Sequence, residues 1–478
     1  MPKHCVIIGG GISGLAAAHR LVELGRERNV PLEITVLEAG PRFGGAIETR
    51  TQDGLLLEGG PDAFIAEKPW ALSLCRRLGL TDQLLETQEA HRRSFILRHG
   101  RLVQVPTGLY LIAPARLSTL LTMGLVSWPA KVRMACEPFI PARRSTEDES
   151  VGSFIRRCFG REALERIGQP MLGGIYTADP DVLSLAATMP RFQEMERTHG
   201  SVVKALAAGA ASSRGAAQAS GPRYSLFVTL RGGLGALIEA LIRSLPGVRL
   251  RPSSPVAHIA AGEAWSVVLE SGERLMADVL CLALPADRTA RLLEACAPDV
   301  ARGLAGIPYE SVATVNLAFR RQDVPVPLDG FGVVIPAVEH RRLVGCTFAS
   351  VKFAGRAPEA SVLLRAFVGG ALHRDVMALD DAAMERLVRE EIASLLGMHA
   401  APSLVWISRH PQAMPQYRVG HLARVAAVEQ TLARHPGLQL AGNGLHGIGI
   451  PDCVHQAELA AERMLAAVHV TATRGATP

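Results

Sequence analysis

The chain opens with short apolar runs on either side of one helical pattern. Residues 5–8 (CVII) form a continuous apolar run, typical of a strand that is buried on both faces of a sheet. Residues 15–24 place apolar side chains at helical spacing, and residues 33–37 (EITVL) form a second strand pattern. Strand, helix and strand in this order predict a βαβ unit and therefore an α/β domain with a parallel sheet.

A glycine-rich turn joins the first predicted strand to the helix. Its residues are Gly9, Gly10, Gly11, Ile12, Ser13 and Gly14. Gly9 permits a tight turn, Gly11 lets a pyrophosphate approach the backbone, and Gly14 lets the helix pack closely on the strand. Glu38 ends the second strand, where its carboxylate suits a ribose and disfavours a 2′-phosphate. The turn predicts a dinucleotide site, and a glycine turn without a ligand is the alternative.

Paired glycines follow this unit. They lie in residues 39–45 (AGPRFGG) and 57–61 (LEGGP). Paired glycines preceded by an arginine suit a backbone pressed against a long, multiply charged ligand. This pattern favours FAD over NAD, with ordinary turns as the alternative.

The end of the chain has a similar pattern. Residues 438–440 predict a strand that runs into a glycine turn, and residues 447–452 (GIGIPD) lead into a helix over 453–465. A second glycine-rich helix start would place another positive helix end on the same cofactor, unless it serves only as a cap. Strands predicted over 248–259 and 277–285 complete a discontinuous cofactor domain.

Composition and charge limit the class of protein. The chain has 478 residues, 48% of them hydrophobic and 20% charged, which predicts two or three folded domains and excludes a disordered chain. The net charge of +6 is concentrated, because residues 91–145 contain nine Lys and Arg against one acid. The eight cysteines occur singly, without a C-x-x-C motif, and predict reduced thiols in a cytoplasmic protein. The first residues lack the pattern of a signal peptide.

The most apolar stretch, residues 102–130, contains Arg116 and three prolines, so it is not expected to span a bilayer. Within it, residues 117–128 predict a helix of about 18 Å flanked by cations, which we expect to dock on a membrane surface. A purely internal helical subdomain is the alternative. Nucleic-acid binding is not expected, because this window lacks interleaved aromatic residues. Residues 205–222 are rich in Ala, Gly and Ser and predict a loop between domains.

Several of these segments resemble the FAD-dependent, amine-oxidase-like flavoproteins. The resemblance rests on residues 9–14, Glu38, 42–45 and 440–453. Within that family the chain is most similar to the protoporphyrinogen oxidases, through segments spread over nearly its whole length. These segments are residues 105–108, 173–176, 230–234, 315–317, 330–332 and 415–421.

The resemblance implies non-covalent FAD and the oxidation of protoporphyrinogen IX to protoporphyrin IX. Six hydrogens would leave in three flavin cycles, each reoxidised by O₂. A flavin carries the redox chemistry, so no catalytic side chain is expected. The expected cofactor-binding residues are Gly9, Gly10, Gly11, Ile12, Ser13, Gly14, Glu38, Ala39, Arg42, Gly45, Gly60, Pro61, Asp62, Ala63, Val256, Trp406, Gly442, Ile448, Gly449 and Ile450.

The family also implies an apolar slot for the macrocycle. Its expected residues are Arg98, Gly174, Phe331, Gly332, Val334 and Phe367, although core packing is the alternative for the phenylalanines and Val334. Where the family places an arginine for a propionate, this chain has Ser94, and Arg98 is the expected replacement because it lies on the same strand face. A solvated surface position is the alternative for Arg98. Tyr417 is a further candidate for the flavin wall.

We therefore expect a Rossmann-like α/β FAD domain (residues 1–90, 225–300 and 420–478). An α+β substrate domain with a mixed sheet would comprise 301–419 with parts of 91–110 and 185–224. A helical, membrane-associating domain would comprise 111–184. The protein is expected at the cytoplasmic side of the membrane, and the sequence is compatible with a homodimer.

Three other functions stay open. Coproporphyrinogen III differs from protoporphyrinogen IX by two propionates, and the single candidate cation favours the latter. A flavin amine oxidase is disfavoured because residues 311–319 contain no lysine, which those enzymes carry in the matching strand. A prenyl-binding escort or inhibitor of the same fold would not need flavin-side glycines at both chain ends.

Overall fold

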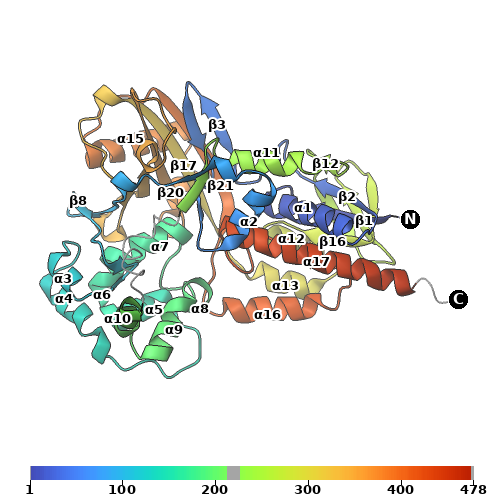
Figure 1. Ribbon diagram of the computed structural model, residues 1–478, viewed down its shortest axis with the longest axis horizontal. Coiled ribbons are helices and arrows are strands. Elements are labelled where there is room, and N and C mark those ends of the chain that lie inside the picture. Colours follow the sequence, from blue (N-terminus) through green and yellow to red (C-terminus); the bar gives the residue numbers. More distant parts are fainter. Residues whose placement is uncertain (1, 213–226, 475–478) are drawn as a thin grey trace.

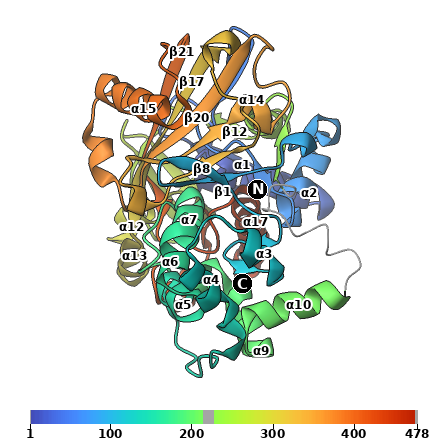
Figure 2. The same ribbon diagram turned by 90° about the vertical axis from the view of Figure 1, so that its left-hand side faces the viewer.

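The computed structural model describes residues 2–212 and 227–474. Figure 1 shows a domain built on a parallel sheet, which carries both chain ends, beside a mixed sheet and a helical lobe. Figure 2 shows the helical lobe lying below the mixed sheet. The Rossmann-like sheet and the mixed substrate sheet predicted from the sequence are both confirmed.

The parallel sheet has five strands. In spatial order these are β12 (Arg249–Arg251), β2 (Leu32–Leu37), β1 (Lys3–Ile8), β16 (Val279–Leu282) and β22 (Leu438–Leu440). The central strand β1 is buried on both faces, since Ile7 packs into one core and Val6 and Ile8 into the other. Burial on both faces explains why this strand is a continuous apolar run.

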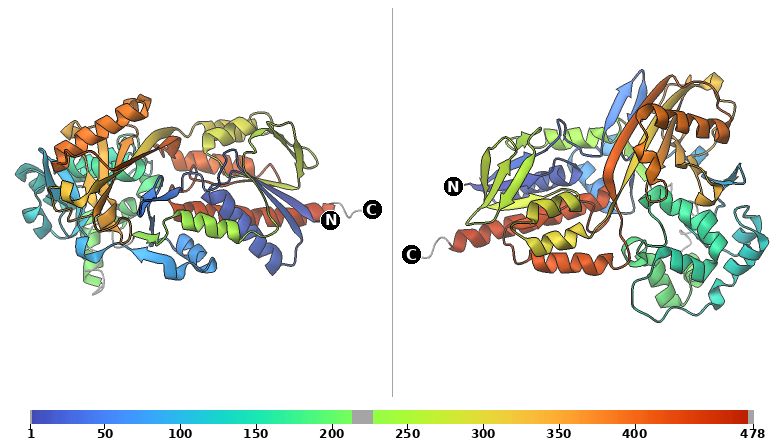
Figure 3. Two further views of the ribbon diagram at one scale, coloured as in Figure 1. Left: turned by 90° about the horizontal axis from the view of Figure 1, so that it is seen from above. Right: turned by 180° about the vertical axis from the view of Figure 1, so that it is seen from behind.

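Helices cover one face of this sheet. They are α1 (Ile12–Glu27), α2 (Pro69–Arg77), α11 (Gly235–Arg243) and α17 (Ile450–Arg474). The view from above in Figure 3 shows α17 and α1, from opposite ends of the chain, on the same side of the sheet, and the two helices pack together. The last helix starts at Ile450 rather than at the predicted residue 453, because Pro451 and Asp452 belong to its first turn.

A small antiparallel sheet and three helices cover the other face. They are β13 (Val256–Ala260), β14 (Trp265–Leu269), β15 (Arg274–Ala277), α12 (Ala286–Leu293), α13 (Pro298–Ala305) and α16 (His421–Leu432). The single strand predicted over 248–259 is therefore wrong, since β12 and β13 belong to different sheets. Pro252 and Pro255 lack a backbone N–H, and Ser253 between them has a φ of 49°, so the chain turns there.

The mixed sheet has seven strands. In spatial order these are β21 (Leu404–Pro415), β17 (Tyr309–Arg320), β20 (Ser361–Gly369), β19 (Leu343–Phe348), β18 (Gly332–Val334), β7 (Phe95–Arg98) and β8 (Arg101–Gln104). Neighbours are antiparallel except β18 and β7. One face packs with α15 (Asp381–Leu396) in an apolar core. The strand register places Thr314, Phe367, Trp406 and Val334 on the opposite face.

The helical lobe has its own apolar core. Its helices are α3 (Ser118–Thr122), α4 (Trp128–Ala135), α5 (Val151–Phe159), α6 (Arg161–Ala163), a π-helical turn (Leu164–Gly168), α7 (Gln169–Tyr176), α8 (Leu185–Thr188), α9 (Pro190–His199) and α10 (Val202–Ser212). The loop predicted from residue 205 is wrong as far as Ser212, which ends α10, and residues 213–222 of that prediction lie outside the described residues.

The helix predicted over residues 117–128 is also wrong, because the structure divides this stretch between α3 and α4. Between the two helices, Met123, Leu125 and Val126 are buried in the core of the lobe. Ser127 starts the second helix by accepting a hydrogen bond from the N–H of Ala130 at 3.4 Å.

Short strands and helices connect these units. They are β3 (Thr49–Gln52), β4 (Leu55–Glu58), β5 (Phe64–Ile65), β6 (Leu84–Glu86), β9 (Leu109–Tyr110), β10 (Ala113–Pro114), β11 (Phe227–Leu230) and α14 (Ala349–Lys352). The β3–β4 hairpin packs Leu55 and Leu57 against Ala318 and Leu363 of the mixed sheet. The loop that follows β4 therefore lies between the two large sheets.

Candidate cofactor and substrate site

The glycine turns from the two ends of the chain lie at the same edge of the parallel sheet. Strands β1, β16 and β22 are parallel neighbours, so the turns that leave their carboxyl ends are adjacent. A Cβ on Gly9 would lie 2.4 Å from the carbonyl oxygen of Ala283, and one on Gly442 would lie 3.3 Å from that of Leu284. The structure thus brings together the two turns that the sequence analysis expected to share one cofactor.

Two kinds of glycine occur at this edge. Gly14 and Gly60 are crowded by protein, since a Cβ would lie 1.8 Å from the oxygen of Gly9 and 1.7 Å from that of Ala46, respectively. Gly11 is open, because the nearest protein atom to its Cβ position is 3.9 Å away, on Gly45. The crowded glycines are needed for packing, whereas the open one leaves room for a ligand against the backbone.

The amino end of α1 suits a phosphate group. Gly11 caps this helix without a side-chain hydrogen bond, and its first turn contains no acid. The first N–H groups of the helix carry a positive partial charge and lie beside the open position at Gly11. Glu38 lies beside them, with its carboxylate oxygens accepting hydrogen bonds from the N–H groups of Gly10 and Gly40 at 2.8 Å each. The N–H donors fit the pyrophosphate of FAD, and the Glu38 carboxylate, an acceptor, fits the hydroxyls of its ribose.

Two tyrosines that the sequence analysis did not assign to this role hold the C-terminal glycine turn. The Tyr417 hydroxyl donates to the carbonyl oxygen of Asn443 at 2.5 Å and accepts from the N–H of Gly447 at 2.9 Å. The Tyr309 hydroxyl lies 3.4 Å from Oδ1 of Asn443. Burial raises the pKa of both phenols, so both remain neutral donors. Tyr417 is only 1% exposed, so its ring does not present a wall to the flavin.

Side chains of the mixed sheet hold the loop at residues 59–63. The carbonyl oxygen of Gly59 accepts from Oγ1 of Thr314 at 2.6 Å and lies 2.8 Å from Nε2 of His410. Trp406 packs its ring near Gly59, and the Arg50 guanidinium stacks on that ring at 4.3 Å. The loop reaches the first glycine turn through residues 45 and 46, since a Cβ on Gly60 would lie 1.7 Å from the oxygen of Ala46 and one on Gly45 would lie 3.2 Å from Cα of Gly11. The loop and the glycine turns are together called the rim below.

Some predicted cofactor residues have roles within the protein. Arg42 donates to the carbonyl oxygens of Gly45 and Ile47 at 2.7 and 3.0 Å, so its charge orders its own loop. Ala39 is exposed, whereas Val256 is half-buried at the start of β13, close to the Glu38 backbone. The remaining predicted residues of this group are half-buried or buried along the rim: Ile12, Ser13, Pro61, Ala63, Ile448, Gly449 and Ile450.

Four predicted substrate residues lie close together. The strand register places Gly332, Val334 and Phe367 on the face of the mixed sheet opposite α15. A Cβ on Gly174 of α7 would lie 3.6 Å from the Val334 side chain. Gly332 has a φ of 148°, and a Cβ there would lie 2.2 Å from the oxygen of Cys346. The backbone conformation and the close packing at position 332 therefore require glycine, apart from any contact with substrate.

The other two predicted substrate residues have partners within the protein. Arg98 donates to the carbonyl oxygen of Gly124 at 2.5 Å and lies 4.0 Å from Glu162, so it ties the mixed sheet to the helical lobe. Phe331 is buried, with 2% of its surface exposed. Ser94, which replaces the arginine of the resembled family, is buried as well.

Two curated relatives cover almost the whole chain. A coproporphyrinogen III oxidase of Propionibacterium freudenreichii subsp. freudenreichii is 38% identical, over 97% of this chain and 90% of the relative. A coproporphyrinogen III oxidase of Bacillus subtilis is 34% identical, over 96% of this chain and 97% of the relative.

A solved structure from Exiguobacterium sp., provisionally described as a protoporphyrinogen oxidase, superposes with a TM-score of 0.85. It is 30% identical and covers 98% of this chain and 99% of that chain. Residues 12–465 match the family of flavin containing amine oxidoreductases, a range that begins within the first glycine turn and includes the C-terminal one. The chain therefore belongs to the flavin containing amine oxidoreductase family, and its cofactor is FAD.

Proposed function

We propose that the protein oxidises coproporphyrinogen III to coproporphyrin III, passing six hydrogens to three O₂ and forming three H₂O₂. The observation that carries this proposal is the 38% identity, over nearly the full length of both chains, to a coproporphyrinogen III oxidase. This relative favours the alternative of the sequence analysis over its main expectation, protoporphyrinogen IX. A count of candidate cations in one strand was a weak guide to the number of propionates.

When bound, FAD would supply the acceptor for hydride, with O₂ as the final electron acceptor. The chain supplies binding and orientation. The amino end of α1 and the open backbone at Gly11 would hold the pyrophosphate, and Glu38 would hold the ribose. The glycine turns at Gly442 and Gly449, together with the loop at 59–63, would orient the ring. The apolar face around Val334 and Phe367 would exclude water from the porphyrinogen.

Two other substrates are weaker candidates. Protoporphyrinogen IX is supported by the description of the Exiguobacterium structure. An amine substrate is disfavoured because β17 contains no lysine. A prenyl-binding escort or inhibitor protein is disfavoured as well, because a protein without redox chemistry would have no need for FAD.

A direct comparison of the two porphyrinogens tests the proposal. We expect kcat/KM for coproporphyrinogen III to exceed that for protoporphyrinogen IX by about tenfold or more, because charge-assisted hydrogen bonds to two further propionates are worth that much. Porphyrin fluorescence measures both rates, and oxygen uptake checks the yield of H₂O₂. Faster turnover of protoporphyrinogen IX would show that it, and not coproporphyrinogen III, is the substrate. If neither porphyrinogen gave a porphyrin product, the proposed activity would be refuted.

We also propose that the helical lobe docks on an anionic membrane surface. Five large apolar side chains between residues 117 and 139 are 51–85% exposed: Leu117, Leu121, Trp128, Val132 and Phe139. Four of the nine cations in residues 91–145 already lie within 4.0 Å of a carboxylate: Arg92, Arg93, Arg98 and Arg143. Apolar contact would therefore contribute more than charge. No helix among the described residues has the length and hydropathy needed to cross a bilayer.

Flotation with vesicles that contain anionic lipid tests this docking. Replacing Leu121 and Phe139 together with serine is expected to weaken vesicle binding about tenfold, because both side chains would leave the apolar interface. Met276→Ser is the matched control, since Met276 is 52% exposed but lies on β15, outside the lobe. The docking would be contradicted if the unmodified protein, the double variant and Met276→Ser floated equally with the vesicles. It would also be contradicted if the unmodified protein did not float at low salt.

A further inference from the structure

Three successive carbonyl oxygens at the start of the loop at 59–63 accept hydrogen bonds from side chains of the mixed sheet. That of Glu58 accepts from Nδ2 of Asn316 at 3.1 Å, that of Gly59 from Thr314 at 2.6 Å, and that of Gly60 from Arg365. On the other side, Gly60 lies directly against the Ala46 backbone. The position of this loop is therefore fixed from both sides, and Arg365 is part of the fixation.

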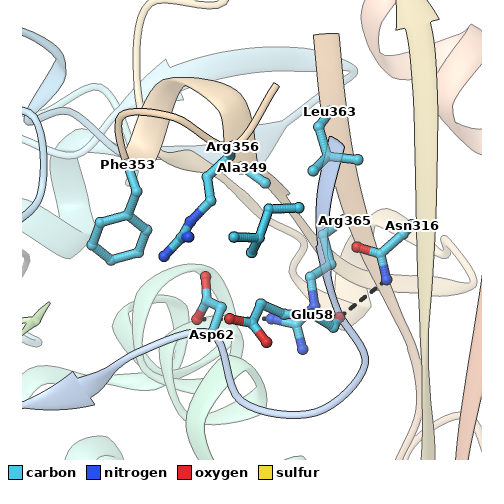
Figure 4. A pocket seen from close by; sticks show the side chains of 9 residues that line it. Glu58, Asp62, Asn316, Ala349, Phe353, Arg356, Leu363 and Arg365 are labelled. Atoms are coloured by element: carbon cyan, nitrogen blue, oxygen red, sulfur yellow. Dashed lines mark hydrogen bonds and ion pairs between the residues drawn. The ribbon is translucent and has the colours of Figure 1, made fainter. Parts of the chain in front are cut away.

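A buried charge cluster lies behind the loop. Figure 4 shows most of it, and its members are Glu58, Asp62, Lys352, Arg356 and Arg365. Asp62 accepts from Lys352 at 2.8 Å and lies 3.7 Å from Arg365. Burial alone would raise the pKa of Asp62, but the positive charges of Lys352 and Arg365 outweigh it and lower the pKa to about 2. Asp62 is thus ionised at every pH of interest.

The cluster carries a net positive charge. Three cations face two carboxylates, and burial raises the pKa of one of these, Glu58, to about 7. The side chains of Arg365 and Lys352 are only 4% and 11% exposed, so solvent screens their charges weakly. A small cavity lies among these groups, where Oδ1 of Asn316 and Nε of Arg365 have no hydrogen-bond partner in the part of the chain that the structure describes. Its lining is part polar and part apolar, and these two polar atoms suit a single water molecule.

We propose that Asp62, Lys352 and Arg365 are positioning residues that fix the flavin-side loop and place a net positive charge behind the flavin ring. The proposal rests on the proposed contact of residues 60–63 with FAD. A nearby positive charge stabilises the reduced, more negatively charged flavin and raises its reduction potential. The balance between Asp62 and Lys352 therefore sets how readily the flavin accepts electrons.

Opposite changes of charge test this proposal. Lys352→Met removes a positive charge and is expected to lower the midpoint potential of bound FAD, whereas Asp62→Asn removes a negative charge and is expected to raise it. Sulfite adds to electron-poor flavins, so the affinity of bound FAD for sulfite should change in the same direction as the potential. We expect it to fall about tenfold in Lys352→Met and to rise about tenfold in Asp62→Asn. A tenfold change corresponds to about 30 mV for two electrons. Lys352→Arg keeps the positive charge, so its midpoint potential and its sulfite affinity should match those of the unmodified protein.

Lys3→Met is the matched control. Lys3 pairs with Asp278 at 2.8 Å, the same type and length of contact, but it lies at the amino end of β1, away from the glycine turns. A purely structural role would loosen the loop in both variants and move both potentials in the same direction, which would overturn the proposal. An unchanged midpoint potential in both variants would also overturn the proposal. If Lys352→Met does not fold, the direction in which Asp62→Asn shifts the midpoint potential decides: a rise supports the proposal and a fall overturns it. These measurements need no porphyrinogen, so an error in the proposed substrate would leave them readable.

Discussion

Replacing Gly11 with alanine is expected to give a protein that folds normally but does not retain FAD. Gly11 has φ and ψ of −74° and −175°, which alanine adopts without strain, and the nearest atom to its Cβ position is 3.9 Å away. The new methyl group would occupy the space where the pyrophosphate approaches the backbone. We expect FAD affinity to fall at least about 100-fold, measured by titration of the apoprotein and by flavin absorbance after purification.

Two further alanine variants give this experiment its controls. Gly14→Ala places a methyl group 1.8 Å from the Gly9 oxygen, so we expect it to reduce stability as well as FAD binding. Gly262→Ala lies in the exposed turn between β13 and β14, where the Cβ position is 3.4 Å from the Ala264 oxygen, and should change neither. A Gly11→Ala protein that binds FAD as tightly as the unmodified chain would show that the phosphates lie elsewhere.

The glycine turns could be predicted because each is a local signal. A turn such as 9–14 must leave a strand, start a helix and admit a ligand, and all three requirements fall within six residues. The meeting of this turn with residues 442–449 followed from parallel topology, since neighbouring parallel strands end at one edge of a sheet.

The helix predicted over 117–128 failed because apolar content alone cannot separate one exposed helix from two short ones with a buried link. Burial of Met123, Leu125 and Val126 in the lobe depends on tertiary contacts. A local signal for the break was nevertheless present, because Ser127 followed by Pro129 is a typical helix start. The capping residues therefore indicate this helix boundary better than the apolar run does.

The buried charge cluster could not be predicted from any local pattern. Arg365 and Gly60 are 305 positions apart in the chain, and Lys352 and Asp62 are 290 apart. Neither Lys352 nor Arg365 lies in a recognisable motif, and charged residues in a strand pattern usually indicate an exposed position. Only the packing of the β3–β4 hairpin on the mixed sheet brings these side chains behind the loop.

Glu58 should make the stability of the protein fall as pH rises from about 4.5 to about 7. Burial raises its pKa from 4.5 to about 7, against the lowering effects of the Thr49 and Leu234 hydrogen bonds and of Arg356 and Arg365. In this pH window the folded protein keeps a proton that the unfolded chain releases, so raising the pH favours unfolding. The penalty is absent below the unfolded pKa and reaches about 3 kcal/mol above pH 7.

Glu58→Gln removes this titration while keeping an acceptor for the N–H of Leu234, which Glu58 now binds at 2.8 Å. Between pH 5 and pH 8, the unfolding free energy of the variant is expected to gain about 2 to 3 kcal/mol relative to the unmodified protein. Urea unfolding of the FAD-saturated proteins at both pH values measures the difference. Glu263→Gln, the same change on the exposed β13–β14 turn, is the control and should leave the two pH curves parallel. Parallel curves for Glu58→Gln would mean that Glu58 is already ionised at pH 5 in the folded protein, held by Arg356 and Arg365 more strongly than burial opposes.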